Sequence, residues 1–228
     1  MIPSKIAMMY IVIPAYNEEQ VIAEVLRGLR DAGYANVIVV DDGSTDNTCL
    51  RARNAGATIV LQHFLNRGKG AAAKTGIEAA KRRGADTIIT MDGDGQHNPA
   101  DITRMLQLLD EGWEVVLGSR LKDPRGMPRW KVLANVAGNL FTWALYGLWV
   151  TDSQSGFRAY SRKAFDLIDT KTDRYEYDSE VIREIRRHHL RFIEIPIAVI
   201  YTEYSMGKAN KQGLKNGLKT LFRMLLST

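Results

Sequence analysis

The stretch TIITMDGDGQHNP, residues 87–99, decides the fold. It starts as an apolar run from Thr87 to Met91 that does not alternate with polar residues, which is typical of a strand covered on both faces. Two aspartates, two glycines and an Asn-Pro pair follow, and Asn98 can cap a helix that begins at Pro99. A covered strand that ends in a polar turn and leads into a helix is the repeating unit of α/β proteins.

The same unit recurs on both sides of this stretch. We expect strands at 8–14, 37–41, 58–61, 87–91 and 114–118, with helices between them at 18–29, 46–54, 71–83 and 99–109. This alternation predicts a mostly parallel sheet flanked by helices, with right-handed crossovers. Ligands of such sheets bind beyond the carboxyl ends of the strands, so the polar segments after those ends form the candidate site.

The composition is that of a globular protein. Of the 228 residues, 45% are hydrophobic and 25% are charged, with 19 Gly and 6 Pro. These proportions exclude the collagen-like and disordered classes. The single cysteine, Cys49, excludes an intramolecular disulfide and a cysteine-based zinc cluster. The first residues lack the basic segment and cleavable apolar core of a secretion signal, so we expect a cytoplasmic protein.

The net charge of +5 is concentrated near the C-terminal end. Five cations and one anion lie from Glu203 onward, which leaves the body nearly neutral and argues against a nucleic-acid partner. Residues 203–228 are predicted to form a basic amphipathic tail for an anionic membrane surface. The same helix could instead dock on the domain or on a second subunit. Its basic stripe consists of Lys211, Lys215, Lys219 and Arg223.

Residues 132–150 form an uncharged stretch, after which we expect helices at 162–169 and 177–188 and a strand at 192–200. As a helix the stretch would be about 28 Å long, barely enough to cross a bilayer. Asn135 and Asn139 share one helical face and disfavour a span, whereas the aromatic residues near its end favour the membrane interface. We therefore expect an amphipathic helix on the membrane surface, with packing on the domain as the alternative.

Asp92 and Asp94 lie two residues apart, separated by Gly93, at the end of the expected strand. Paired carboxylates, with a glycine that lets the backbone approach closely, suit a hard divalent cation that completes its shell with phosphate oxygens. Gln96 could add a neutral oxygen ligand. An EF-hand loop is excluded, because other residues occupy the positions of its glycine and its terminal glutamate.

DDGSTDNT, residues 41–48, follows the second expected strand. Ser44 or Thr45 can cap the next helix, which accounts for a polar turn but not for two acidic residues. Asp41 and Asp42 emerge beside the cleft, where a carboxylate can accept hydrogen bonds from a ribose or a nucleobase N–H. The segment therefore predicts a nucleoside site.

NRGKGAAAKTG, residues 66–76, follows the third expected strand. Gly68, Gly70 and Ala73 fit the G-x-G-x-x-A pattern of dinucleotide-binding folds, which leaves an oxidoreductase as a remote alternative. That pattern belongs after the first strand, however, not the third. Lys69 and Gly70, at the start of a helix, could instead face a diphosphate.

Taken in order, these segments resemble glycosyltransferase family 2, the inverting enzymes with a GT-A type nucleotide-sugar domain. The resemblance is carried by VIPAYNEE at 12–19, VVDDGSTDNT at 39–48, NRGKGAA at 66–72, MDGDGQHNP at 91–99, GSR at 118–120 and DSQSGFRAY at 152–160. The QH and SGFR residues are most similar to the subgroup of dolichol-phosphate mannose synthases and bacterial polyprenyl-phosphate glycosyltransferases.

The resemblance implies a site for each substrate group. The nucleotide site would consist of Pro14, Tyr16, Glu18, Asp41, Asp42, Lys69, Gly70, Asp92 and Gly93. Mg²⁺ or Mn²⁺ would bind Asp92, Asp94 and Gln96, and Arg120 would face phosphate. The catalytic centre would consist of Asp94, Arg120, Asp152 and Arg158. In YSMGKANK, residues 204–211, a tyrosine replaces an arginine common in the mannose synthases, which leaves Lys208 as a candidate phosphate ligand.

The class of acceptor decides which further residues matter. A phosphate monoester is already anionic at neutral pH and needs cations, for which Arg129, Lys131 and Arg158 are placed. A hydroxyl acceptor would need a general base instead. The candidates for that base are Asp152, Asp178 and Glu180, and Asp152 could also hold the sugar or cap a turn.

We therefore expect one GT-A domain over residues 1–202, with a nucleotide-sugar half at 1–120 and an acceptor half at 121–202, followed by the tail. The expected activity is metal-dependent, inverting transfer of a hexose from a GDP-mannose or UDP-glucose type donor to a polyprenyl or dolichyl phosphate at the cytoplasmic membrane face. Transfer to a glycan hydroxyl and a non-catalytic nucleotide-sugar-binding module remain alternatives.

Overall fold

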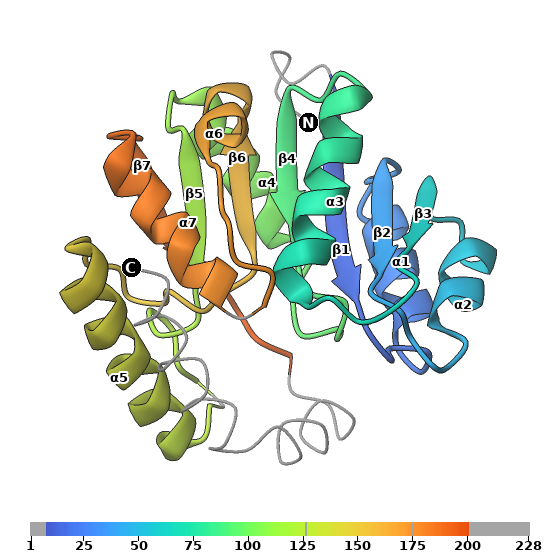
Figure 1. The fold of residues 1–228 in the computed structure, drawn as a ribbon, viewed down its shortest axis with the longest axis horizontal. Helices are drawn as coiled ribbons and strands as arrows, with labels where there is room; N and C mark the ends of the chain where they lie inside the picture. The colour runs from blue at the N-terminus through green and yellow to red at the C-terminus, as the bar shows by residue number, and fades with distance from the viewer. Residues whose placement is uncertain (1–7, 126, 175, 201–228) are drawn as a thin grey trace.

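The computed structural model describes residues 8–125, 127–174 and 176–200. These residues contain one seven-stranded sheet with the order β3-β2-β1-β4-β6-β5-β7 (Figure 1). The strands are β1 (Met9–Ala15), β2 (Val37–Asp41), β3 (Ile59–Gln62), β4 (Thr87–Thr90), β5 (Val115–Ser119), β6 (Arg158–Ser161) and β7 (Phe192–Pro196). Neighbouring strands are parallel except where β6 pairs with β4 and β5. The predicted mostly parallel sheet is confirmed.

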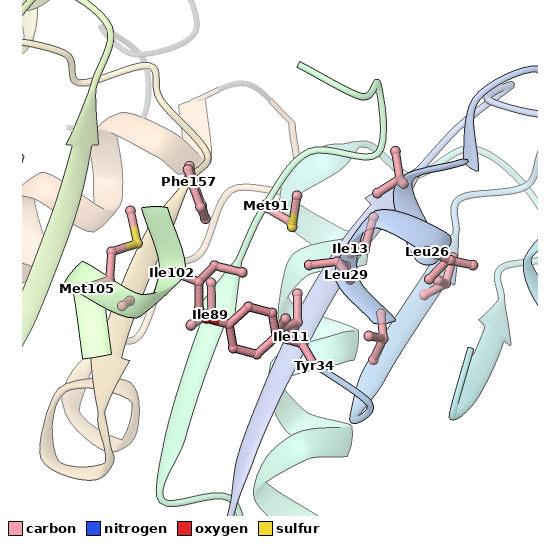
Figure 2. Close-up of a cluster of buried hydrophobic side chains, with 14 of the residues drawn as sticks. Ile11, Ile13, Leu26, Leu29, Tyr34, Ile89, Met91, Ile102, Met105 and Phe157 are labelled. Atoms are coloured by element: carbon pink, nitrogen blue, oxygen red, sulfur yellow. The ribbon is translucent and has the colours of Figure 1, made fainter. Parts of the chain in front are cut away.

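Helices cover both faces of this sheet (Figure 1). They are α1 (Ile22–Asp31), α2 (Thr48–Asn54), α3 (Lys69–Arg82), α4 (Asp101–Asp110), α5 (Arg129–Tyr146), α6 (Arg162–Leu167) and α7 (Glu176–Arg187). Ile11 and Ile13 of β1 pack with α1 and α4 in one core cluster (Figure 2). Tyr10 and Val12 of the same strand pack with α3 and α7 in a second cluster. Burial on both faces explains why the strands are continuously apolar.

Several helix ends differ from the sequence expectation by one or two residues, and three elements differ by more. The helix expected at 18–29 begins only at Ile22, because Asn17 adopts a left-handed φ of 53° and the Glu18 N–H is bonded to Thr48 Oγ1 at 2.8 Å. Strand β6 was not predicted, since its four residues give no repeating pattern. The strand expected at 192–200 ends at Pro196.

Helix α5 has the reverse of the usual amphipathic pattern. Its buried residues are Asn139, Thr142 and Tyr146, and it ends at Gly147, whose left-handed φ of 64° suits a helix end. Its exposed large apolar side chains are Trp130, Leu133, Val136, Leu140 and Trp143. None of the helices in the described residues is long and apolar enough to cross a membrane.

Candidate active site

The expected site, called the cleft below, lies where the direction of the strand order reverses. The chain passes from β1 outward to β2 and β3, and then crosses to β4 on the other side of β1. Ligands of α/β sheets bind beyond the carboxyl ends of the strands at such a reversal. Tyr16 directly follows β1, and Asp92 lies two residues after the end of β4. The expected nucleotide and metal residues thus meet at one edge of the sheet.

Asp41 and Asp42, the nucleoside candidates, connect the loops that follow β2 and β3. Asp41 is fully buried, accepts hydrogen bonds from the Ser44 N–H at 3.2 Å and from Gln62 Nε2 at 2.9 Å, and also contacts the Ser44 hydroxyl. Asp42 accepts from the Gly68 N–H at 2.6 Å and contacts His63 Nδ1 at 2.7 Å. Both carboxylates organise loops, and nucleoside binding by them stays a prediction.

The loop after β1 interlocks with the loop after β2. Asn17 donates its N–H to Ser44 Oγ at 2.9 Å, and its own Oδ1 accepts from the Thr45 N–H at 2.9 Å. The prediction that Ser44 or Thr45 caps the next helix is wrong, because Asp46 Oδ1 accepts the Thr48 N–H at 2.9 Å. Hydrogen bonds to this carboxylate hold its pKa below the ordinary value against the opposing effect of burial.

The remaining nucleoside candidates lie along the same wall. Pro14 is partly buried at the end of β1, where it is paired with Val40 of β2. Tyr16 is 40% exposed, whereas Glu18 is buried beneath the interlocked loops. The arrangement leaves the aromatic ring of Tyr16 at the surface of the cleft.

Asp92 is paired with two basic groups. Its Oδ1 lies 2.8 Å from Lys69 Nζ, and its Oδ2 lies 3.4 Å from His97 Nε2. Burial alone would raise the pKa of Asp92, but Lys69 and His97 outweigh that effect and hold the pKa well below its usual range. The carboxylate is therefore ionised at neutral pH. The ring of His97 packs on Phe157 with centroids 4.8 Å apart.

Asp94 differs from Asp92 in its surroundings. Its Oδ1 accepts the Gln96 N–H at 3.1 Å, and burial together with the charge of Asp92 raises its pKa. Two carboxylates that repel each other in a partly buried turn fit a divalent cation. In the described residues no group of three or more His, Cys, Asp or Glu side chains could hold a metal, so a bound ion would need further oxygen ligands. Gln96 and a donor diphosphate are the candidate sources.

Glycines let the chain approach itself closely around this pair. A Cβ at Gly93 would lie 3.2 Å from Pro14 O, and a Cβ at Gly70 would lie 2.6 Å from Tyr177 Cβ on α7. Gly68 has a φ of 112°. The G-x-G pattern thus serves the packing of α3 on α7, which explains it without a dinucleotide.

Arg120 and Asp152 form the opposite wall. Asp152 Oδ2 accepts from Arg120 Nε at 2.7 Å, and Oδ1 accepts from Nη2 at 2.8 Å. The pKa of Lys131 is lowered by burial and by the charge of Arg120, while Asp94 opposes the shift, so the three groups share one region. Arg129 is exposed at the start of α5. Lys208 lies outside the described residues.

Three other candidates are internal supports. Arg158 is 1% exposed, and its guanidinium donates to the carbonyl oxygens of residues 153, 155 and 178. In this buried position Arg158 supports the backbone, and its contact with the acceptor phosphate stays a prediction. Glu180 Oε2 accepts from the Lys171 and Thr172 N–H groups at 2.9 and 2.8 Å. Asp178 lies 3.0 Å from Lys69 Nζ and 3.4 Å from Arg158 Nη2.

Sequence reasoning missed two residues of the site. His63 joins Asp42 to helix α3, because its Nε2 lies 3.0 Å from Thr75 Oγ1. A Cβ at Gly156 would lie 2.5 Å from Lys69 Nζ and 2.6 Å from Asp92 Oδ1. The SGFR segment signalled the importance of the Gly156 region but drew attention to its arginine. Nothing in the sequence distinguished His63 from an ordinary loop histidine.

A switch-point cleft with an acidic turn after β4 and an antiparallel strand β6 beside it is the arrangement of a GT-A type glycosyltransferase domain. Comparison with known proteins agrees. The family model described as Glycosyl transferase family 2 matches residues 10–168. This chain belongs to glycosyltransferase family 2 and is a glycosyltransferase, which excludes the oxidoreductase alternative.

Two relatives and one crystal structure illustrate the similarity. The chain is 37% identical over 241 residues to a UDP-N-acetylglucosamine–dolichyl-phosphate N-acetylglucosaminyltransferase of Methanococcus voltae, covering 96% of this chain and 95% of that one. It is 32% identical over 213 residues to an undecaprenyl-phosphate mannosyltransferase of Micrococcus luteus, covering 89% and 86%. The fold matches Mycobacterium tuberculosis glucosyl-3-phosphoglycerate synthase in complex with Mn²⁺, UDP and phosphoglyceric acid, with a TM-score of 0.66 at 21% identity, covering 94% of this chain and 78% of that one.

Proposed function

We propose that this glycosyltransferase moves a hexose or N-acetylhexosamine from a nucleotide sugar to a polyprenyl or dolichyl phosphate, with inversion, at the cytoplasmic face of a membrane. The observation that carries the proposal is the closeness of two cations, Arg120 and Lys131, whose charges act on each other while Asp94 acts on Lys131. The two relatives are named for transfer to dolichyl phosphate and to undecaprenyl phosphate, which supports a polyprenyl-type phosphate as the acceptor.

The donor would occupy the cleft between the β1 loop and the acidic turn. Tyr16 and the Asp41–Asp42 loop would receive the nucleoside, and the start of α3 would face the diphosphate. Asp92, Asp94 and Gln96 would hold Mg²⁺ or Mn²⁺. A divalent ion bound there neutralises the charge that develops on the nucleotide leaving group.

A phosphate acceptor fits the site better than a hydroxyl acceptor. A hydroxyl needs a general base, and each of the three acidic candidates is buried and already engaged. Asp152 is paired with Arg120, Asp178 with Lys69, and Glu180 with the N–H groups of residues 171 and 172. A phosphate monoester is a nucleophile without such a base, and Arg120 and Lys131 would orient it.

Helix α5 would bring the enzyme to the lipid. Its N-terminal turn carries Arg129 and Lys131, and its exposed face is apolar with two tryptophans, Trp130 and Trp143. Tryptophan side chains favour the boundary between water and lipid. The helix lies at the same end of the molecule as the arrowhead of β1 (Figure 1), so its apolar face would meet the membrane beside the cleft. Residues 203–228 would add a basic anchor.

The test is transfer of radiolabel from GDP-mannose, UDP-glucose and UDP-N-acetylglucosamine into a product extracted by organic solvent. The assay uses the purified full chain, polyprenyl phosphate and Mn²⁺ or Mg²⁺. We expect label from one donor, lost with chelator and in Asp94→Ala. Label that persists with chelator would contradict the metal site, and no label from any donor would contradict the proposed reaction.

A further inference from the structure

Lys69 lies between two carboxylates that come from different parts of the fold. Its ammonium is 2.8 Å from Asp92 Oδ1 and 3.0 Å from Asp178 Oδ2. Asp92 belongs to the turn after β4, whereas Asp178 belongs to the first turn of α7. One cation at the start of α3 therefore joins the acidic motif to a neighbouring helix.

The carboxylates of Asp92 and Asp178 differ in how exposed they are and in how firmly their neighbours hold them. The Asp178 side chain is 3% exposed and also meets Arg158, so it is a fixed part of the α7 packing. The Asp92 side chain is 28% exposed and faces the cleft. The backbone of Gly156 closes one side of the ion pair, since a Cβ there would collide with both the ammonium and the Asp92 carboxylate. Lys69 is thus confined between a fixed anion and an accessible one.

We propose that Lys69 is a placeholder cation, which occupies Asp92 in the empty enzyme and moves to the donor diphosphate when donor and metal bind. The inference rests on the proposed function and names how that site changes between its two states. Lys69 would give up Asp92 and keep Asp178 as its second anchor. Asp178 is then a positioning residue that acts through Lys69.

Simple electrostatics supports this exchange. Asp92 and Asp94 repel each other, and the Lys69 ammonium, 2.8 Å from Asp92 Oδ1, offsets that repulsion in the empty site. The same ammonium would repel a divalent ion at Asp92 unless another anion could hold it. Asp178 supplies that anion at 3.0 Å, and it does so from an element outside the acidic turn. The flexible four-carbon stem of lysine lets its ammonium serve both positions.

If Lys69 makes this exchange, removing its charge should raise the affinity for Mn²⁺ alone and lower the affinity for Mn²⁺ with nucleotide. We would measure the affinity of the full chain for Mn²⁺ alone, and then for Mn²⁺ with UDP and with GDP, by calorimetry. Lys69→Met should bind Mn²⁺ alone at least about threefold more tightly, because a competing ion pair of ordinary strength is gone. It should bind the Mn²⁺–nucleotide pair at least about threefold more weakly, because the diphosphate loses an ammonium.

Lys131→Met is the matched control, since it also removes a cation whose charge interacts with Asp94. It should change the affinity for Mn²⁺ alone by less than half as much. If both variants gained the same affinity for Mn²⁺ alone, the gain would come from long-range charge and not from the Lys69–Asp92 ion pair, which would overturn the placeholder. An unchanged or weaker affinity of Lys69→Met for Mn²⁺ alone would overturn it as well, provided that urea unfolding shows an intact fold.

The binding assay contains no acceptor, which separates this inference from the proposed reaction. Opposite shifts without transfer to lipid would refute the acceptor and support the placeholder. Transfer without opposite shifts would refute the placeholder alone. Failure of the unmodified chain to bind Mn²⁺ in the presence of either nucleotide would refute both.

Discussion

The carboxylate of Asp152 holds Arg120 from three directions. It accepts the Arg120 backbone N–H at 2.9 Å, Nε at 2.7 Å and Nη2 at 2.8 Å. The Asp152 side chain is fully buried, whereas that of Arg120 is 21% exposed, so the guanidinium is fixed on one side and partly accessible to solvent. Such a bidentate pair orients the guanidinium as well as neutralising it.

The first prediction concerns this pair. Asp152→Asn should lower the free energy of unfolding by about 2 kcal/mol, because one partner of a largely buried ion pair is left alone. Transfer should fall by at least about tenfold, since Arg120 is no longer oriented. Urea unfolding and the label assay check the two effects. Asp123→Asn, which breaks a pair on an exposed loop, should change neither.

The second prediction concerns Gly156. Gly156→Ala should weaken metal-dependent nucleotide binding, because its Cβ would lie 2.5 Å from Lys69 Nζ and 2.6 Å from Asp92 Oδ1 and would displace both side-chain ends. Gly138→Ala is the matched control, as a Cβ there meets nothing within 4 Å. In a helix interior it should raise the free energy of unfolding by up to about 1 kcal/mol. Normal nucleotide binding by Gly156→Ala would contradict the described geometry.

The third prediction concerns the support of Asp42. His63→Leu should weaken UDP and GDP binding by about fivefold, because Asp42 loses the partner that links it to α3. Thr75→Val leaves the His63–Asp42 contact and removes only the second hydrogen bond, so its effect should be smaller. Calorimetric titration of both variants with UDP and GDP checks that His63→Leu loses more affinity than Thr75→Val. Equal affinities in all three proteins would show that Asp42 does not meet the nucleotide.

The fourth prediction concerns the apolar face of α5. The double variant Leu133→Glu and Leu140→Glu should lose most binding to vesicles of anionic lipid, since both side chains are exposed and face outward. Its free energy of unfolding should change by less than about 0.5 kcal/mol per site. Leu50→Glu, at an equally exposed leucine on α2, is the control. Undiminished sedimentation with vesicles would contradict the proposed membrane contact.

The sequence predicted the strands of the nucleotide half well, because strands covered on both faces are short, apolar and separated by polar turns. The acidic turn could also be predicted, since Asp92 and Asp94 are close together in the sequence as well as in the fold. Strand β6 escaped, as four residues that pair antiparallel with β4 and β5 leave no periodic signal. Pairing partners far along the chain cannot be found from spacing alone.

The candidate site was less predictable where a side chain can point either into the protein or toward solvent. Arg158 and Glu180 are charged, and charge at a sequence level favours exposure, yet both are buried against backbone groups. The inward face of α5 was also unexpected, because Asn139 bonds the backbone of Ser153 while the leucines face outward. Tertiary hydrogen bonds decided these directions.

A lipid phosphate acceptor is tested most directly by comparing undecaprenyl phosphate with undecaprenol at equal concentration in the label assay. Because Arg120 and Lys131 would orient a phosphate and the acidic candidates are engaged, we predict transfer to the phosphate and none above background to the alcohol. Transfer to undecaprenol at a comparable rate would show that a hydroxyl is activated in this site, and would contradict the account.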